Sequence, residues 1–296
     1  MLNALFLMVC MIAPPAGSAT RIITLSPALA EMVFDVGAGR DLVGTVRFSR
    51  HPARAREVPR VGDAFSLDLS RILFLRPTLI LAWKGGTPPA AIAALRRLHL
   101  TVVSLGATRL RGIARELVTI GQLTGHAVQA ERAEQAFRMT LARMRQVSRE
   151  PVPLRVFYEI ARSPLYTIGR PQIISRAIRV CGGTGIFAGI DEMAFPVSLA
   201  AVLKRNPQVI IVGRARSVRF WERFRELSAV RAGAVDVIRP GLLAQATPRM
   251  LRGIEMLCQD LARARISRAI RQGALRGGGG ASHGYGPRVL PPHLPP

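Results

Sequence analysis

Two segments of the chain repeat one local pattern, and this repetition constrains the fold more than any other feature of the sequence. Residues 69–82 (LSRILFLRPTLILA) and 199–212 (LAAVLKRNPQVIIV) each combine a short amphipathic helix, a proline that ends it, and a continuous β-branched run. Such a run is suited to burial on both faces, as in a parallel sheet. The runs RIITLS at 21 and RVFYEI at 155 lie at nearly the same offset. We therefore expect two α/β lobes of similar construction.

The start of the first lobe alternates strand and helix. The apolar run 21–26 is bounded by Pro27, a helical pattern follows over 29–34, and a second apolar stretch begins at Leu42. A strand, a helix and a strand in about 25 residues form a βα unit, which favours a parallel sheet. The predicted fold class is α/β, with two Rossmann-like lobes.

A single long helix is predicted to join the lobes. Residues 126–149 contain no proline or glycine, and Pro151 and Pro153 follow them. Apolar side chains recur there at helical spacing: Val128, Ala133, Ala136, Phe137, Leu141, Met144 and Val147. We expect an N-terminal lobe over 20–125, a linker helix over 126–150 and a C-terminal lobe over 151–262. A stiff linker implies a largely preformed ligand cleft between the lobes.

Both ends of the chain differ in composition from the lobes. Leu2 to Pro14 is apolar but too short to span a bilayer, and Gly17-Ser18-Ala19 suits signal-peptidase cleavage. Residues 1–19 are therefore predicted to be a signal peptide for export to the periplasm, although a basic start is missing; a buried N-terminal helix is the alternative. Residues 263–296 are rich in Arg, Gly and Pro and are predicted to form a disordered basic tail.

The net charge of +24 resembles that of a nucleic-acid-binding protein, but its distribution does not. The basic residues are scattered along the chain, only Lys84 and Lys204 are lysines, and aromatic residues make up just 5%. No aromatic side chains alternate with a basic stripe, as base stacking would require. We therefore expect no nucleic-acid partner, whereas an acidic ligand or an anionic membrane surface stays compatible with the charge.

Two cysteines remain once Cys10 is assigned to the signal peptide. Cys181 and Cys258 form an even pair, which indicates a disulfide in an oxidising compartment, with two buried thiols as the alternative. The bond would close a loop of 77 residues and contribute roughly 4 kcal/mol in the chain-entropy model. The five histidines are dispersed, and no zinc-type spacing occurs, so no metal site is expected.

No catalytic motif is present, which argues against an enzyme and against a bound cofactor. The phosphate-loop, nucleophile-elbow and dinucleotide fingerprints are missing. The glycines at 182–185 follow a helical pattern over 173–180 and are interpreted as a helix C-terminal turn. Asp191 and Glu192 are interpreted as solvated surface residues. A cofactor-dependent enzyme remains an alternative only if titratable groups gather in the cleft.

Large side chains instead follow several predicted strands, where α/β folds place ligand sites. Trp83 precedes Lys84-Gly85-Gly86, a backbone that a ligand can approach closely. The other members of this set are Phe48, His51, Phe65, Tyr166 and Phe195. Core packing is an equal alternative for each one, but their shared position after strands of both lobes favours a common binding site.

Several segments resemble one protein family. They are RIITLSPALAEMVFDVGAG, LILAWKGG, CGGTGIF, and Ala246-Thr247-Pro248-Arg249 with Cys258. Over residues 20–262 they resemble the rigid-helix class of periplasmic solute-binding proteins, which serve cobalamin, haem and siderophores; LILAWKGG and the two cysteines resemble its cobalamin branch. The resemblance implies a disulfide between Cys181 and Cys258, a corrinoid ligand, a monomer, and delivery to an ABC permease with its ATPase.

The resemblance also assigns site residues by position. Phe48, Trp83 and Phe195 match aromatic cleft residues of the family, with Phe65 beside a shifted aromatic position. A ligand-contacting loop matches Gly241, Leu242, Leu243, Ala244 and Gln245. This loop is normally more polar, with an acid and an arginine at the last two positions. The two glutamates that dock the family to its permease correspond to Ser70 and Ala200, so both acids are absent.

A haem or ferric-siderophore binder of the same family is the alternative function. Haem would require an axial ligand, for which His51 or Tyr166 is the candidate.

Overall fold

The computed structural model describes residues 20–63 and 66–276. The predicted signal peptide, Phe65 and the last twenty residues of the predicted tail therefore lie outside the described residues. The described chain divides into two compact units. Unit 1 comprises the chain up to Arg143 together with Gly241–Leu251, and unit 2 comprises Met144–Pro240 together with the chain from Arg252 onward.

Unit 1 is built on a parallel four-stranded sheet in the order β2-β1-β3-β4. Its elements are β1 (Ile22–Thr24), α1 (Pro27–Asp35), the 3-10 helices η1 (Ala38–Asp41) and η2 (Ala53–Arg56), β2 (Leu42–Thr45), α2 (Leu69–Phe74), β3 (Leu79–Trp83), α3 (Pro89–Arg97), β4 (Val102–Leu105) and α4 (Leu110–Thr124). These bounds confirm the strand, helix and strand predicted at the start of the lobe. Ser26 caps α1 by accepting a hydrogen bond from the Leu29 amide, and Pro27 occupies the first helical turn.

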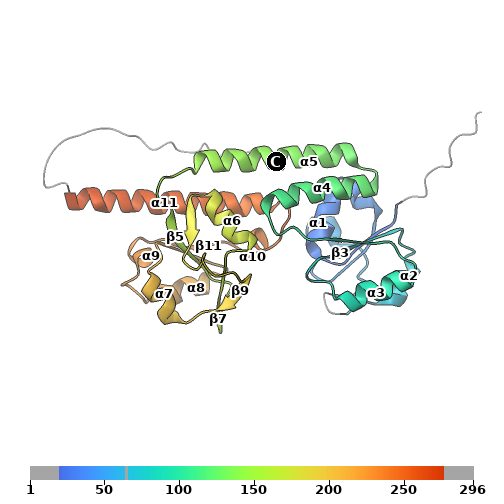
Figure 1. The fold of residues 1–296 in the computed structure, drawn as a ribbon, viewed down its shortest axis with the longest axis horizontal. Coiled ribbons are helices and arrows are strands. Elements are labelled where there is room, and N and C mark those ends of the chain that lie inside the picture. The colour runs from blue at the N-terminus through green and yellow to red at the C-terminus, as the bar shows by residue number, and fades with distance from the viewer. Residues whose placement is uncertain (1–19, 64–65, 277–296) are drawn as a thin grey trace, which may run out of the picture. The chain divides into compact units, whose positions relative to one another are not determined.

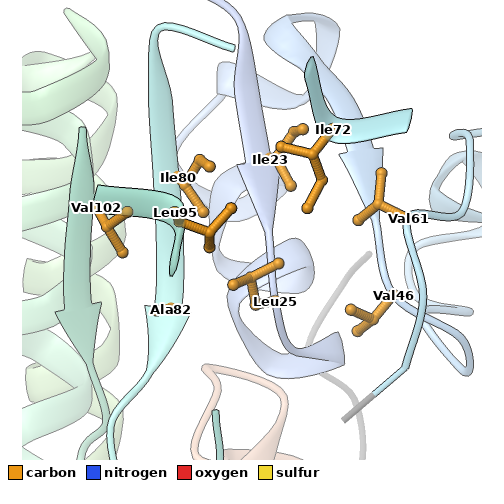
Figure 2. Close-up of a cluster of buried hydrophobic side chains, with 9 residues drawn as sticks. All are labelled: Ile23, Leu25, Val46, Val61, Ile72, Ile80, Ala82, Leu95 and Val102. Carbon is orange, nitrogen blue, oxygen red and sulfur yellow. The ribbon is translucent and has the colours of Figure 1, made fainter. Parts of the chain in front are cut away.

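The core cluster between the unit 1 sheet and helices α2 and α3 is aliphatic. Ile23, Leu25 and Ile80 point from the sheet toward Ile72 of α2 and Leu95 of α3, as Figure 2 shows. Because β1 and β3 are central strands, their alternate residues Ile22 and Leu81 are equally buried on the other face. Burial on both faces explains why these strands are continuous apolar runs rather than alternating ones.

Unit 2 repeats this architecture with a sheet in the order β11-β10-β5-β8, all parallel. A three-stranded antiparallel sheet, β6-β7-β9, follows the end of β5. The elements are β5 (Leu154–Tyr158), β6 (Ala161–Arg162), β7 (Leu165–Ile168), α6 (Ile173–Val180), β8 (Gly183–Gly185), β9 (Ala194–Pro196), α7 (Leu199–Arg205), β10 (Val209–Val212), α8 (Ala215–Trp221), α9 (Ser228–Arg231) and β11 (Val235–Val237).

The two sheets confirm the duplication and the α/β class predicted from the repeated pattern. Strand β1 corresponds to β5, and β3 to β10, each partner occupying the same place in its sheet. Helix α2 precedes β3 as α7 precedes β10. The predicted glycine turn is confirmed at Gly182, which has φ +71 after the last turn of α6. The three residues that follow it form strand β8, which the sequence reading missed.

Helix α5 (Ala127–Val147) is the predicted long helix, drawn above α4 in Figure 1. Its buried residues are Ala130, Phe137 and Leu141. The predicted apolar stripe is too wide, because Val128 and Val147 are at least half exposed. Ala130 packs so closely on Gly121 of α4 that a side chain at 121 would come within 2.2 Å of it.

Two predicted boundaries in the last part of the chain are wrong. Residues 241–251, which include part of α10 (Pro240–Leu243), belong to unit 1 rather than to the second lobe. Helix α11 (Met250–Arg276) continues fourteen residues into the predicted disordered tail. Arg263 pairs with Asp236 and Asp260, and Arg265 donates to the Gly182 carbonyl, so tertiary contacts order this Arg-rich stretch.

Candidate functional site

Trp83 lies at the end of β3 in a tight turn. Its carbonyl accepts hydrogen bonds from the amides of Gly86 (3.1 Å) and Thr87 (2.8 Å), while the Thr87 hydroxyl accepts one from the Trp83 amide. The indole lies directly against Gly86, where an added Cβ would meet the ring at 1.8 Å. Glycine at 86 therefore permits this ring position, and Trp83 remains 44% exposed.

A cavity of about 650 Å³ adjoins Trp83 within unit 1. Its walls are mostly apolar and come from the turn after β3 and from α3: Trp83, Lys84, Gly85, Thr87, Pro89, Ile92, Ala93, Arg96, Arg97 and Ser104. This volume lies in the range of small-molecule sites. The two arginines make it suitable for an apolar group that also carries a hydrogen-bond acceptor or a negative charge.

A buried carboxyl group supports the end of the neighbouring strand. The Glu116 carboxylate of α4 accepts a hydrogen bond of 2.5 Å from the Gly106 amide, just beyond β4. Burial raises the pKa of Glu116, and the hydrogen bonds from the Gly106 and Ala107 amides oppose that rise. The group holds the loop after β4 and does not line the cavity.

Phe48 follows β2 and is presented outward. The residue has φ +68 and is 67% exposed, and the guanidinium groups of Arg47 and Arg50 lie 5.8 and 5.7 Å from its ring centre. The next residue, Ser49, is fully buried and bonded to the Thr45 hydroxyl at 2.9 Å. Phe48 is therefore an exposed aromatic ring on an anchored loop, in a basic environment.

Phe48 and Trp83 follow strands that run in the same direction in one sheet. Strands β2 and β3 both pair in parallel with β1, so their carboxyl ends meet at one edge. This edge is where α/β folds bind ligands. His51, the candidate haem ligand of this loop, is also exposed.

The segment 241–251 is attached to unit 1 at two points. Leu243 is fully buried. Four residues later, Thr247 donates a hydrogen bond of 2.7 Å to the buried Glu31 carboxylate, to which Arg249 donates from both Nε and Nη2. Between these anchors Ala244 is exposed, and Gln245 accepts a hydrogen bond from Arg249. The loop predicted to contact ligand is thus held at both ends.

In unit 2, Tyr166 and Phe195 lie on opposite faces of the small antiparallel sheet. Phe195 of β9 pairs with Thr167 of β7, so these two side chains share a face. Tyr166 is the neighbour of Thr167 in β7, and its side chain therefore lies on the other face. Phe195 is half-buried against Phe187, with ring centres 5.7 Å apart, and packs on the core cluster of unit 2. The structure therefore favours core packing for Phe195 and leaves Tyr166 as the candidate on the other face.

Unit 2 also contains a buried acid that the sequence did not predict. The Glu159 carboxylate, which directly follows β5, accepts hydrogen bonds of 2.6 Å from the Ser217 hydroxyl and from the Trp221 indole. Both donors belong to α8, so the group attaches this helix to the sheet. No spacing rule in the sequence pairs residue 159 with 217 or 221, which are about 60 positions away.

The cysteine pair and the two predicted docking positions lie outside the candidate ligand contacts. Cys181 and Cys258 form a disulfide, which links the end of α6 to α11 and confirms the pairing. Ser70 and Ala200 are exposed and are each the second residue of a helix, α2 and α7. Within residues 20–63 and 66–276, no three His, Cys, Asp or Glu side chains are close enough to hold a metal ion. No described helix is both long and apolar enough to cross a bilayer.

Comparison with known proteins agrees with this architecture. The model of the periplasmic binding protein family matches residues 22–235, more than half of the chain. The chain belongs to the periplasmic binding protein family. Among its curated relatives are the vitamin B12-binding proteins of Vibrio cholerae, 32% identical over 82% of this chain and 89% of theirs, and of Yersinia pseudotuberculosis, 31% identical over 88% and 92%.

Solved structures of periplasmic binding proteins have the same fold. The crystal structure of the vitamin B12-binding protein of Vibrio cholerae matches with a TM-score of 0.76 at 31% identity, over 83% of this chain and 98% of that one. The haem-binding protein of Roseiflexus sp. RS-1 matches with a TM-score of 0.74 at 21% identity, over 83% and 99%. This second likeness shows the fold alone.

Proposed function

We propose that this chain is the solute-binding component of an ABC importer and that it captures cobalamin or a related corrinoid. The observation that carries the proposal is the identity of 31–32%, over more than four-fifths of the chain, to proteins named vitamin B12-binding protein. We place the protein in the periplasm after removal of residues 1–19, as a monomer without catalytic activity or a resident cofactor. It delivers the ligand to a permease that has a cytoplasmic ATPase.

Two exposed aromatic rings of unit 1 support this assignment. Phe48 and Trp83 lie at the carboxyl edge of the sheet on loops that hydrogen bonds hold in place. A corrin ring presents a broad, largely apolar face, and stacking on such rings gains about 25 cal/mol per Å² of apolar surface buried. Tyr166 is the proposed ligand contact from unit 2. Phe195 packs against the core of unit 2 and is proposed to act on the ligand only indirectly, through that packing.

The loop from Gly241 to Gln245 contributes shape more than specific hydrogen bonds. Leu243 is buried as an anchor, and Ala244 carries no polar group. The basic residues near Phe48 and along α3 remain the polar contacts that unit 1 offers. We expect the ligand to be held by stacking and by arginine contacts to its acceptor groups.

Titration of the purified protein with cyanocobalamin tests the proposal. Phe48→Ala and Trp83→Ala are each expected to weaken binding about tenfold, since an aromatic contact and its buried area are worth on the order of 1.5 kcal/mol. Phe74→Ala is the matched control, because Phe74 is an 83% exposed phenylalanine on the second turn of α2. The Phe74→Ala variant should bind cyanocobalamin as tightly as the unmodified protein does. Failure of the unmodified protein to bind any corrinoid would overturn the proposal.

Titration with haemin separates the alternative function. Haem remains the alternative ligand because several haem-binding proteins have the same fold, although their identity to this chain is only 19–23%. A haem complex should show a shifted Soret band that His51→Ala or Tyr166→Phe abolishes. Corrinoid binding without such a band supports the first assignment, and the reverse result supports the second.

A further inference from the structure

A second cavity, of about 300 Å³, lies within unit 2 and is lined mainly by arginines. Its lining residues are Arg155, Gln208, Ser228, Arg231, Ala232, Arg268 and Arg271. We call it the arginine pocket. Four of the seven residues are cationic, and none is acidic. The site therefore has a positive potential, which solvent screens in part because three of the four arginines are exposed.

The arginine pocket lies at the amino edge of the unit 2 sheet. Arg155 is the second residue of β5, Gln208 directly precedes β10, and α9 precedes β11. Because these three strands are parallel, their beginnings share one edge. Tyr166, by contrast, follows the carboxyl end of β5. The pocket is therefore separate from the residues proposed to contact the transported solute.

Three of the four guanidinium groups are held by neutral acceptors only. Arg155 donates to the Asn206 carbonyl at 2.9 Å, and Arg231 donates to the Glu226 carbonyl. Arg271 donates to the carbonyls of Ser267, at 3.2 Å, and of Arg231. These bonds position the side chains without neutralising them. None of the four takes part in an ion pair within residues 20–63 and 66–276.

Arg268 is the least constrained of the four. No side-chain hydrogen bond to it is found in the described part of the chain, and it is half-buried on α11. Its charge acts on the neighbouring Arg265: burial lowers the pKa of Arg265 most, Glu150 raises it, and the Arg268 charge makes a smaller contribution that lowers it.

We propose that the arginine pocket binds a phosphate-type anion, either free phosphate or the phosphate of an anionic phospholipid headgroup. Guanidinium groups bind phosphate oxygens through paired, charge-assisted hydrogen bonds, and several arginines on different segments can surround one phosphate. The cavity volume is ample for a phosphate group. This site does not depend on the identity of the transported solute.

Calorimetric titration with inorganic phosphate, at an ionic strength held constant with chloride, tests the proposal. The variant R268Q/R271Q removes two charges from the pocket and keeps good helix-forming residues on α11. The control R219Q/R225Q removes two charges from exposed arginines of unit 2 that do not line the pocket. Each lost charged contact should weaken binding about tenfold, so the pocket variant should lose about a hundredfold and the control very little.

Vesicles distinguish the two sources of the phosphate group. Co-sedimentation with phosphatidylglycerol vesicles, compared with phosphatidylcholine vesicles, measures headgroup binding, and added phosphate should compete with it if the pocket is the site. Binding of free phosphate without vesicle binding assigns the pocket to a soluble anion. Vesicle binding that the pocket variant loses, and the control keeps, assigns it to a lipid.

Three results would overturn the proposal. They are the absence of saturable binding to both phosphate and anionic vesicles, an equal loss in the control variant, and binding that chloride at equal ionic strength abolishes. Solute titration of both variants serves as the folding control. Normal solute binding together with lost phosphate binding separates this site from the proposed transport function.

Discussion

Units 1 and 2 order their parallel strands in the same way but fill their cores with different side chains. The core cluster of unit 1 contains only aliphatic residues, whereas Phe157, Phe187 and Trp221 are buried in that of unit 2. Unit 1 instead exposes Phe48 and Trp83. The exposed rings of unit 1 are candidate ligand contacts, whereas Phe187, which follows β8 in unit 2, packs in the core.

The duplication extends to single hydrogen bonds. Arg21 precedes β1 and donates from Nε and Nη2 to the Leu75 carbonyl at the end of α2. Arg155, the second residue of β5, donates to the Asn206 carbonyl at the end of α7. Each arginine satisfies a carbonyl that the helix itself leaves without a partner. What distinguishes unit 2 is that α9 and α11 add three more arginines beside Arg155.

The largest expected effect on stability comes from removing the disulfide. Among the described residues, only unit 2 contains a disulfide. Replacing Cys181 and Cys258 by serine should lower the free energy of unfolding of unit 2 by roughly 4 kcal/mol, because the bond closes a loop of 77 residues. Urea unfolding followed by Trp fluorescence measures the loss. If the double variant unfolds at the same urea concentration as the parent protein, the disulfide does not account for the stability of unit 2.

The two tryptophans provide a matched comparison of core and surface. Trp221→Phe leaves one oxygen of the buried Glu159 carboxylate without a donor and should destabilise unit 2 by about 3 kcal/mol. Trp83→Phe should cost less than about 0.5 kcal/mol, because the ring is half exposed and its Nε1–H is not needed for folding. Thermal unfolding of both variants gives the comparison. Equal losses would mean that Trp83 is as much a core residue as Trp221.

The raised pKa of Asp260 in α11 should make the stability of unit 2 depend on pH. Burial, and next the nearby Asp236 charge, raise the pKa of Asp260 to about 6, while Arg263 opposes the rise. Between the unfolded value of 3.8 and about 6, the folded chain keeps a proton that the unfolded chain has lost. Stability therefore falls as pH rises through this window, by at most about 1.4 kcal/mol per pH unit, and the loss is constant above it.

Asp260→Asn isolates this contribution. The stability of the variant relative to the parent should rise by about 2 kcal/mol between pH 4 and pH 7, measured by urea unfolding at both values. Asp191→Asn is the control, since Asp191 is largely exposed in its pair with Arg170. A relative stability of Asp260→Asn that does not change with pH would exclude the buried acid as a source of pH dependence.

The smallest expected effect compares the two helices that occupy equivalent places in the units. Ser70→Glu and Ala200→Glu each put an acid at the second position of a helix, which should stabilise it by about 0.5 kcal/mol. We expect no gain in binding to the proposed permease, because a partner of so basic a chain should be adapted to other contacts. Tighter co-purification of the double variant with that permease would show that these positions still dock.

The local pattern of the sequence was sufficient to predict the duplicated sheets. Helix ends at Ser26-Pro27 and Asp68, and the apolar runs of β3 and β10, depend on neighbours within a few positions, so they are readable without tertiary contacts. The pairing of Cys181 with Cys258 was readable because only two cysteines remain after the predicted signal peptide. The sequence left core packing and ligand contact equally open for Phe48 and Trp83, and the structure shows both side chains exposed.

Tertiary structure alone decided which residues are brought together from distant segments. Segment 241–251 belongs to unit 1 because Arg249 pairs with Glu31, 218 positions earlier, and α11 continues to Arg276 while Arg263 pairs with Asp236. Phe195 lies within β9 and packs in a core, whereas Phe48 follows β2 and is exposed, although both were predicted to follow strands. Whether a side chain is buried, and which charged group lies beside it, depends on contacts between distant segments that the spacing of residues in the sequence does not reveal. The sequence by itself therefore determined the repeated α/β framework, and the fold determined where the proposed ligand contacts and the residues of the arginine pocket lie.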